Sequence, residues 1–429
     1  MDKDISKGQK LTYAGAAFGQ NIIYTFTAAY LMFFYTDILG ITAAAAGILF
    51  LVTRVFDALN DPLMGFVADR TRTRFGKFRP YLMISPPVIA LITILCFVAP
   101  SGPYVLLYAY ITYFAWGIAY TFGDIPLWAI PSVLSRDLEQ KTSAVTWSKV
   151  GGLLGQVTIV VGGIMLLEYF GGQWEASAYL KTALTLGIPG AALMVLAGIT
   201  LRERIRHTES IPFRAGFKTL FQNKRIFPLM LAFFLFNLTL GLRAGMQLYY
   251  ATYVLGDASF MMFIGGAIVI GMAGGMVLAP FVIKRYGPLL MFNISCLISG
   301  VISFIPQFTG YENRIQLLIW IAASFLWMGV ANIAWPALLL STVADSEKRT
   351  NLPIEGIFFS AQTFVLKLVA SVSAGIAGLA LSMLGYVERA EQTDRVITGL
   401  HTLMFAFPAV LFLLAPVPML FYYRAVKNA

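Results

Sequence analysis

The sequence predicts an all-α membrane protein with twelve transmembrane helices in two six-helix bundles. The first observation is composition: 58% of the 429 residues are hydrophobic, only 12% are charged, and the mean hydropathy is +0.75. Soluble domains carry about 25% charged residues, so this chain has too few charges to cover the surface of a soluble protein. The composition excludes a cytosolic enzyme, a disordered scaffold and a secreted disulfide-bonded module.

The second observation is the length of the apolar stretches. A helix needs about 20 apolar residues to span the hydrocarbon core, and the chain contains twelve such stretches. They cover residues 12–36, 42–68, 80–99, 104–132, 146–168, 178–201, 226–254, 258–282, 287–308, 314–341, 355–384 and 397–423. They are too long, and too continuous, for membrane β-strands of about 9–11 residues. The charged N-terminus lacks the pattern of a signal peptide, so we expect the first span to be retained.

The third observation is the placement of the 31 Lys and Arg residues. An even number of spans puts both termini on one side, and most of the positive charge falls on that side. The opposite loops carry only Lys181, Arg314, Arg389 and Arg395. Cytoplasmic loops retain positive charge, so we expect cytoplasmic termini and a location in the plasma (inner) membrane. The net charge of +10 therefore orients the chain and does not indicate a nucleic-acid partner.

The longest basic loop divides the spans six and six. We expect an N-terminal bundle over residues 1–201, a central cytoplasmic loop over 202–225 and a C-terminal bundle over 226–429. The two halves echo each other, because Tyr35-Thr36-Asp37-Ile38-Leu39-Gly40 ends the first span and Tyr253-Val254-Leu255-Gly256 ends the seventh. Transporters are often built from two such repeats, with the substrate site near the midplane between them.

Three carboxylates lie inside predicted spans, where a charge at the helix centre costs about 2.5–3.5 kcal/mol on insertion scales. Asp57 and Asp61 are four residues apart and so share a helical face, and Asp124 lies late in the fourth span. Neighbouring carboxylates repel, so the three either hold protons or bind a hard cation. With the oxygens of Asn60 and Thr121 they form the ligand set that such a cation prefers. We predict a metal-ion or proton site in the N-terminal half.

Positive charges also fall inside the spans. Lys149, Arg243 and Lys367 are candidates for facing a cavity or an acid, although Lys149 lies near a span end and can reach water by snorkelling. Arg54 lies three residues before Asp57 and can neutralise that acid alone. One arginine cannot balance three acids, however, so a purely structural role does not explain the set.

Two tryptophans are candidate platforms for a sugar, because aromatic rings stack on the C–H face of a pyranose. Trp128 lies four residues after Asp124 and so shares its helical face. Trp335 has no such neighbour. A tryptophan in a membrane helix also serves as an interfacial anchor, and both interpretations stay open for Trp335.

Several longer motifs carry a family resemblance. They are Phe33-Phe34-Tyr35-Thr36-Asp37, Arg54-Val55-Phe56-Asp57-Ala58-Leu59-Asn60-Asp61-Pro62, Arg74-Phe75-Gly76-Lys77-Phe78-Arg79-Pro80, Asp124-Ile125-Pro126-Leu127-Trp128 and Gln362-Thr363-Phe364-Val365-Leu366-Lys367. They resemble the glycoside–pentoside–hexuronide:cation symporters of the melibiose permease-like type, over essentially the whole chain in one register. The resemblance implies a major facilitator fold and sugar uptake driven by sodium, lithium or protons.

The resemblance also implies roles for individual residues. Asp57 and Asp61 resemble the cation-site pair of the family, with Asn60, Thr121 and Asp124 beside them. Trp128 and Lys149 complete a sugar-binding trio with Asp124, although the family has Arg where Lys149 stands, and the eleventh and tenth spans supply further contacts. The full substrate-binding set that we expect is Gln20, Asn21, Asp124, Trp128, Lys149, Arg243, Trp335, Gln362, Thr363 and Lys367.

Two segments depart from the family pattern. Gln20-Asn21 stands where the family has Lys-Asp, and an amide accepts hydrogen bonds more weakly than a carboxylate. Galactoside specificity therefore does not carry over. The loop Asp345 to Pro353 lacks the usual Asp-Tyr-Gly-Glu run, so we expect a different gate there.

The sequence thus predicts a monomeric, cation-coupled sugar symporter that works by alternating access and needs no cofactor beyond the coupling cation. An anionic sugar such as a hexuronide is an alternative substrate, because Asn21 replaces an acid while three buried cations are available. A lipid or lysolipid transporter of the same superfamily is a second alternative. A channel lacks support because no pore loop or charge ring is present. An enzyme lacks support because His207 and His401 form no nucleophile–base pair.

Overall fold

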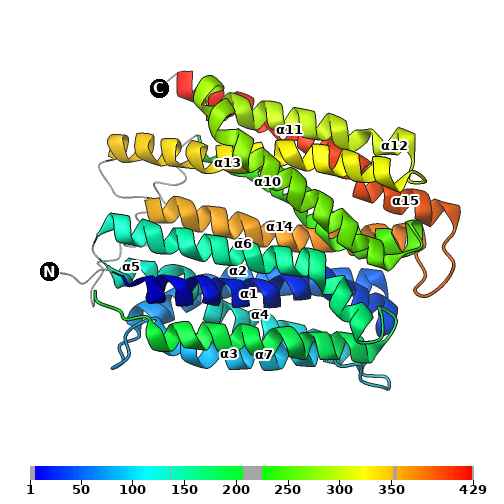
Figure 1. The fold of residues 1–429 in the computed structure, drawn as a ribbon, viewed down its shortest axis with the longest axis horizontal. Helices are drawn as coiled ribbons and strands as arrows, with labels where there is room; N and C mark the ends of the chain where they lie inside the picture. Colours follow the sequence, from blue (N-terminus) through cyan, green and yellow to red (C-terminus); the bar gives the residue numbers. More distant parts are fainter. Residues whose placement is uncertain (1–4, 136, 206–224, 351–354, 428–429) are drawn as a thin grey trace. The chain divides into compact units, whose positions relative to one another are not determined.

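The computed structural model describes residues 5–135, 137–205, 225–350 and 355–427 as helices joined by short connections (Figure 1). The chain divides into two compact units, Met1–Glu209 and Ser210–Ala429. Three features that the sequence singles out lie outside the described residues: positions 206–224 of the central loop, the side chains of Arg54 and Asp61, and the side chains of the segment Asp345 to Pro353.

The first unit consists of seven named α-helices and one short π-helix. They are α1 (Lys7–Phe33), η1 (Phe34–Ile38), α2 (Ala43–Arg70), α3 (Arg79–Cys96), α4 (Val105–Ala129), α5 (Pro131–Leu134), α6 (Leu138–Tyr169) and α7 (Ala176–Thr200). Within this unit α1 packs between α6 and α7, while α3 packs against α4 and α7. Figure 1 shows α3 and α7 lying side by side along their length.

The second unit repeats this plan with more interruptions. Its elements are α9 (Ile226–Tyr249), η2 (Tyr250–Val254), η3 (Ala258–Phe260), α10 (Met261–Tyr286), α11 (Pro288–Phe304), α12 (Pro306–Thr309), α13 (Arg314–Thr350), α14 (Glu355–Leu384), α15 (Asp394–Met404), α16 (Ala406–Leu414) and α17 (Pro416–Lys427). The predicted last span is three short helices in succession. Pro408 and Pro416 lie near the two breaks, because proline lacks the N–H that a continuous helix needs.

Ten of the described helical segments are long and apolar enough to cross a membrane, and they coincide with the third to twelfth predicted spans. α1 and α2 have 27 and 28 residues and so reach about 40 Å. Among the residues searched, Ala43–Thr53 of α2 is a shorter apolar segment. The rest of the helix holds Asp57, Asn60 and Asp61.

The first helix of each unit ends in the same way. A five-residue π-helix follows α1 and another follows α9, and each continues into a leucine and then a glycine. Gly40 and Gly256 have φ angles of 69° and 68°, a left-handed conformation that a residue without a Cβ adopts at no steric cost. The weak sequence echo between the two halves is therefore a structural repeat at this position.

Glycines bring α1 and α6 into backbone contact. Gly151 and Gly155 are one turn apart on α6, and a Cβ on either would collide with a carbonyl oxygen of α1, that of Ala14 or that of Phe18. In lipid there is little hydrophobic gain from pairing two helices, so small residues that permit close packing take over that role. The Gly151/Gly155 pair therefore fixes α1 against α6.

The second unit uses the same device between α10 and α13. A Cβ on Gly271 would collide with the carbonyl oxygen of Ala322, and one on Gly275 with that of Leu326. Gly274 is different, because a Cβ there would meet only a methyl group of Leu326 at 3.9 Å. Adjacent glycines on α10 therefore face different surroundings.

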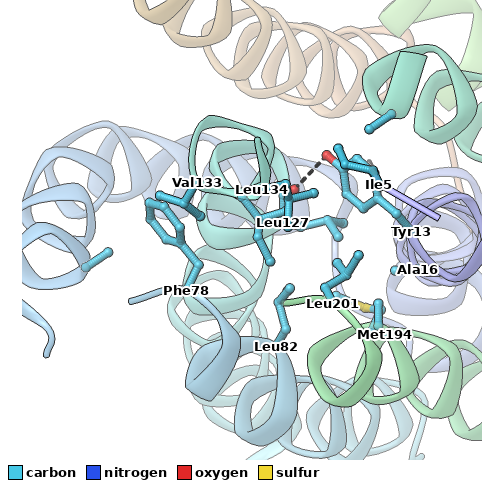
Figure 2. Close-up of a cluster of buried hydrophobic side chains, with 14 of the residues drawn as sticks. Ile5, Tyr13, Ala16, Phe78, Leu82, Leu127, Val133, Leu134, Met194 and Leu201 are labelled. Atoms are coloured by element: carbon cyan, nitrogen blue, oxygen red, sulfur yellow. Dashed lines mark hydrogen bonds between the residues drawn. The ribbon is translucent and has the colours of Figure 1, made fainter. Parts of the chain in front are cut away.

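An apolar cluster closes one end of the first unit (Figure 2). Figure 2 shows side chains of α3, α4, α5 and α7 meeting α1, with Leu127, Leu134 and Leu201 near the middle. The hydroxyl of Tyr13 donates a hydrogen bond to the carbonyl oxygen of Leu127 at 2.9 Å, so the polar tip of this buried ring is satisfied. The cluster links the end of α4 to α1.

A carboxylate and a guanidinium join the neighbouring ends of α3 and α7. Glu203 accepts hydrogen bonds of 2.7–2.9 Å from three successive backbone N–H groups. They belong to Arg79, the first residue of α3, and to the two residues before it. Arg79 in turn donates through Nε and Nη2 to the carbonyl oxygens of Gly198 and Ile199, each at 2.8 Å. Each side chain satisfies backbone groups that a helix end leaves unpaired and carries the charge that the helix dipole favours there.

The contrast between neighbouring glycines gives a test of the α10–α13 contact. Gly275→Ala places a methyl group against the backbone of α13, and we expect it to lower the free energy of unfolding by about 1–3 kcal/mol, as overpacking does. Gly274→Ala has room for its methyl and should be neutral or slightly stabilising, since alanine is the better helix former. Thermal unfolding of the purified protein in detergent compares the two variants. Equal stabilities would contradict the packing.

Candidate functional site

Polar residues form a stripe along α4. Tyr120, Asp124 and Trp128 follow one another at four-residue intervals, so they lie one turn apart on one face of the helix. The indole Nε1 of Trp128 donates a hydrogen bond of 2.9 Å to Oδ1 of Asp124. The shared face that the sequence predicts for Asp124 and Trp128 is therefore confirmed, and the carboxylate holds the ring in place.

α1 supplies the second partner of the carboxylate. The Nε2 group of Gln20 donates to Oδ1 of Asp124 at 2.8 Å and also contacts the hydroxyl of Tyr120. Gln20 is only 5% exposed. Its Oε1 accepts a hydrogen bond of 2.7 Å from Nδ2 of Asn21. Both hydrogen-bonding ends of the Gln20 amide are thus engaged within the first unit.

Asn21 is half-buried beside Gln20 on α1. Its Nδ2 also donates to the carbonyl oxygen of Ala17 at 2.9 Å, and a Cβ on Gly152 would lie 2.9 Å from the same nitrogen. The side chain therefore lies in the α1–α6 interface. Gln20, and not Asn21, makes the direct contact with Asp124.

Lys149 completes the group from α6. Its Nζ lies 4.9 Å from the ring centroid of Trp128, within the range of a cation–π contact. The side chain is exposed, and its charge interacts electrostatically with that of Asp124. Asp124, Trp128 and Lys149, the trio that the family resemblance implies, are therefore connected through the indole ring, which touches both charges.

The first expected cation ligand lies against the same helix, two turns earlier. Asp57 is 2% exposed, and a Cβ on Gly117 of α4 would lie 2.8 Å from its Oδ1. The rings of Phe50 and Tyr113, 4.6 Å apart, show that α2 and α4 run in the same direction, because both residues precede the Asp57–Gly117 contact on their helices. Only glycine at position 117 leaves room for this carboxylate.

The other expected cation ligands follow from this register. Position 61 and Thr121 each lie one turn beyond the Asp57–Gly117 contact, and Asp124 lies almost one turn further along α4. Thr121 Oγ1 donates to the carbonyl oxygen of Gly117 at 3.1 Å. Among the described residues, no group of three His, Cys, Asp or Glu side chains is placed to bind a metal ion. The Asp61 side chain lies outside the described residues.

Asn60 adds an observation in favour of a ligand at this level. Its Nδ2 atom is buried and has no hydrogen-bond partner among the described residues. Such an atom is costly to leave unmatched inside a protein. The oxygen and nitrogen of an amide are assigned by their neighbours, so rotation of the amide would place Oδ1 at the same point. An oxygen there suits a hard cation.

The second unit holds the remaining candidates. Thr363 and Lys367 lie one turn apart on α14, with Thr363 exposed and with Gln362 and Lys367 half-buried. Trp335 is 2% exposed and stacks on Phe233, with ring centroids 4.2 Å apart. Its ring is part of an aromatic cluster inside this unit and presents no free face for a sugar.

Arg243 is also enclosed within the second unit. It is 3% exposed, and its guanidinium carbon lies 5.3 Å and 5.9 Å from the ring centroids of Phe325 and Phe412. Its Nη1 donates a long hydrogen bond of 3.4 Å to Oγ of Ser324. These contacts are with α13 and α16, so Arg243 is separate from the Thr363–Lys367 face of α14.

Two tyrosines near the α4 stripe escaped the sequence interpretation. Tyr120 touches Gln20 through its hydroxyl, and Tyr24 of α1 packs on the Tyr120 ring with centroids 5.4 Å apart. Tyr120 lies four residues before Asp124, and Tyr24 lies four residues after Gln20. The same spacing rule that placed Trp128 beside Asp124 was sufficient to find Tyr120.

Comparison with known proteins identifies the family. Residues 12–424 match the family described as MFS/sugar transport protein. The chain belongs to this family. It is 30% identical to the uncharacterized symporter YnaJ of Bacillus subtilis (strain 168), over 98% of this chain and 92% of that protein. It is 28% identical to the isoprimeverose transporter of Lactiplantibacillus pentosus, over 96% and 88% of the two chains.

A solved structure supports the fold. The bacterial homolog of the human lysosomal transporter Spinster, in its inward-facing and unoccupied conformation, matches with a TM-score of 0.73 at 14% identity, over 98% of both chains. The resemblance to the glycoside–pentoside–hexuronide:cation symporters is confirmed by the family and its named members. The protein is a multi-pass plasma membrane transporter of the major facilitator superfamily and not an enzyme.

The contact between Gln20 and Asp124 can be measured with a double-mutant cycle. Gln20→Leu and Asp124→Leu each remove one side of the hydrogen bond, and the double variant removes both. We expect a coupling energy within about 0.5–3 kcal/mol, the range for residues in one network. The cycle compares the free energies of unfolding in detergent of the wild-type protein, the two single variants and the double variant. Strictly additive effects would show that the two side chains act independently.

Proposed function

We propose that the protein is a cation-coupled symporter of a sugar or glycoside that works as a monomer by alternating access. The observation that carries this proposal is the Asp124–Trp128–Lys149 group, in which a carboxylate, an aromatic ring and a cation meet in the first unit. We further propose twelve spans, with α1 and α2 as the first two, and cytoplasmic termini. The coupling cation is cargo, and no other cofactor is required.

The sugar would bind by replacing contacts that the site already makes. Gln20 donates a hydrogen bond to Asp124, and a sugar hydroxyl can donate to that carboxylate in its place. Such an exchange leaves the number of hydrogen bonds to the Asp124 carboxylate unchanged, so it costs little free energy at that group. Trp128 would stack on the C–H face of the sugar, while Lys149 would donate to a ring or hydroxyl oxygen.

Contacts from the second unit would come from α14. We propose Gln362, Thr363 and Lys367 for this role, because they share or adjoin one exposed stretch of that helix. The proposal leaves out Trp335 and Arg243, whose side chains are enclosed by other residues of the second unit. It also gives Asn21 a supporting part, since this residue positions Gln20.

The cation would bind between α2 and α4. Asp57 and Asp61 supply charge, and Asn60, Thr121 and Asp124 supply further oxygens. Bound sodium, lithium or a proton would relieve the repulsion among the acids and hold α2 against α4. The sugar site is on α4 as well, so each ligand should increase the affinity for the other by the same factor.

Asp61→Asn tests the coupling. The wild-type protein should bind its sugar several-fold more tightly when sodium, lithium or a lower pH is supplied, and the variant should lose this dependence because the cation site loses a charge. A thermal-shift screen of sugars, each with and without sodium, measures the effect and identifies the substrate. Asp257→Asn is the matched control, since it removes an exposed carboxylate bound to Arg314 in the second unit. Uphill uptake by proteoliposomes without any cation gradient would refute the scheme.

An anionic sugar, such as a hexuronide, is the second candidate substrate. The observation in its favour is the exposed Lys149 ammonium, which lies over the ring of Trp128. Such a cation can accept the carboxylate of a substrate at the edge of the proposed sugar site.

Lys149→Gln distinguishes the two substrate classes. If the substrate is anionic, the variant should lose at least tenfold in affinity for a glycosiduronic acid and change little toward the matching neutral glycoside. Lys181→Gln, which removes an exposed charge from α7 of the same unit, should change neither. Competition binding with the two sugars gives both affinities. Equal inhibition by the acid and the neutral glycoside in the wild-type protein would exclude the anionic class.

A lipid or lysolipid substrate is also compatible with the superfamily. A lipid does not need an indole ring that is hydrogen-bonded to a carboxylate, as Trp128 is to Asp124. Trp128→Ala would therefore leave lipid transport unchanged. The hydrogen bond between Trp128 and Asp124 favours the sugar.

A further inference from the structure

Arg243 is a buried charge without an opposite charge. It lies on α9 at 3% exposure and makes no ion pair among the described residues. A guanidinium stays protonated in proteins, and an uncompensated charge inside a protein is strongly destabilising. The rings of Phe325 and Phe412 compensate only in part, since a cation–π contact is worth about 0.5–2 kcal/mol. Something else must balance this charge.

No acid of the second unit can do so. Five of its acids lie in the described connections or helix ends, and none pairs with Arg243. The other three, Asp345, Glu347 and Glu355, lie near the far ends of their helices. Asp345 is 21 residues beyond Ser324 on α13, which is about 32 Å along the axis. Glu355 is 18 residues before Ser373, whose hydroxyl lies beside Gly241 of α9, which is about 27 Å.

A cluster of three serine hydroxyls reaches the guanidinium through Ser324. Ser324 Oγ accepts the 3.4 Å hydrogen bond from Arg243 and lies 2.6 Å from Oγ of Ser303 and 3.1 Å from Oγ of Ser299. The three serines are 0–1% exposed and come from α11 and α13. The cluster holds O–H groups that can turn toward a negative charge and contains no carboxylate.

Buried polar atoms without a described partner lie on the same helices. The Nε of Arg243 is buried and has no hydrogen-bond partner among the described residues. The same holds for Nε2 of Gln247, one turn further along α9, and for Oγ of Ser295, one turn before Ser299 on α11. The Nε–H group of Arg243 can only donate, so the partner that it lacks is an acceptor.

We propose that Arg243 and the hydroxyls of Ser299, Ser303 and Ser324 bind a small monovalent inorganic anion of the halide class inside the second unit. One guanidinium balances one negative charge, so a divalent anion such as sulfate would leave the site charged. Hydroxyl and guanidinium N–H groups suit a spherical acceptor that has no donor of its own. The site serves stability of the second unit and does not depend on the proposed sugar transport.

Thermal unfolding in sodium chloride and in sodium methanesulfonate tests the site. Sodium stays constant, so the coupling cation does not vary, and methanesulfonate is larger than a halide and is not a sugar acid. The wild-type protein should be stabilised by chloride in a saturable manner, and bromide should substitute. Ser324→Ala keeps the charge and removes one ligand, so the half-saturating chloride concentration should rise about tenfold or more, as expected for a lost hydrogen bond to a charged group.

Arg243→Gln should abolish the chloride dependence. Arg314→Gln is the matched control, because it removes an exposed arginine of the same unit and should leave the dependence unchanged. If Arg243→Gln does not fold, binding of radiolabelled chloride to the wild-type protein supplies the second measurement, with one ion expected per chain. Identical unfolding in chloride and methanesulfonate, or absence of bound label, would overturn the proposal.

Discussion

The structure depends on one constraint: a polar group inside the hydrocarbon core has no water, so it must find its partner within the protein. The Asp124 carboxylate shows what this requires. It accepts hydrogen bonds from Trp128 on its own helix and from Gln20 on α1. A charge that needs donors from two helices fixes the distance and the rotation of both, so the polar residues of α1 and α4 organise the unit as well as its candidate site.

Close packing makes these hydrogen bonds possible. Gly151 and Gly155 let the backbone of α6 touch that of α1, and this contact sets the depth at which Gln20 and Asn21 lie. Gly117 plays the same part on α4, where the missing side chain leaves room for Asp57. Small residues and buried charges are therefore parts of one arrangement, because a hydrogen bond of 2.8 Å tolerates little change in the separation of two helices.

Periodicity and hydropathy predicted the helical class, ten of the spans and the shared face of Asp124 and Trp128, since each follows from spacing within one helix. The sequence could not decide which side of a helix faces which neighbour. Gln20 reaches Asp124 and its neighbour Asn21 does not, because one residue rotates the side chain by about 100° around the axis. The burial of Trp335 was also out of reach of the sequence. This ring stacks on Phe233 of α9, a neighbour about 100 residues away in the chain.

The helix α4 explains how two ligands can be coupled without a long pathway. Its contact with Asp57 at Gly117 and its carboxylate at Asp124 are seven residues apart, about two turns or 10 Å. A helix is stiff over that length, so any displacement of α4 toward α2 moves Asp124, Tyr120 and Trp128 by a similar amount. Gln20 must then follow or give up its hydrogen bond. Coupling between the α2 face and the α1 face of α4 thus needs only the rigidity of one helix and the cost of leaving a buried carboxylate without its donors.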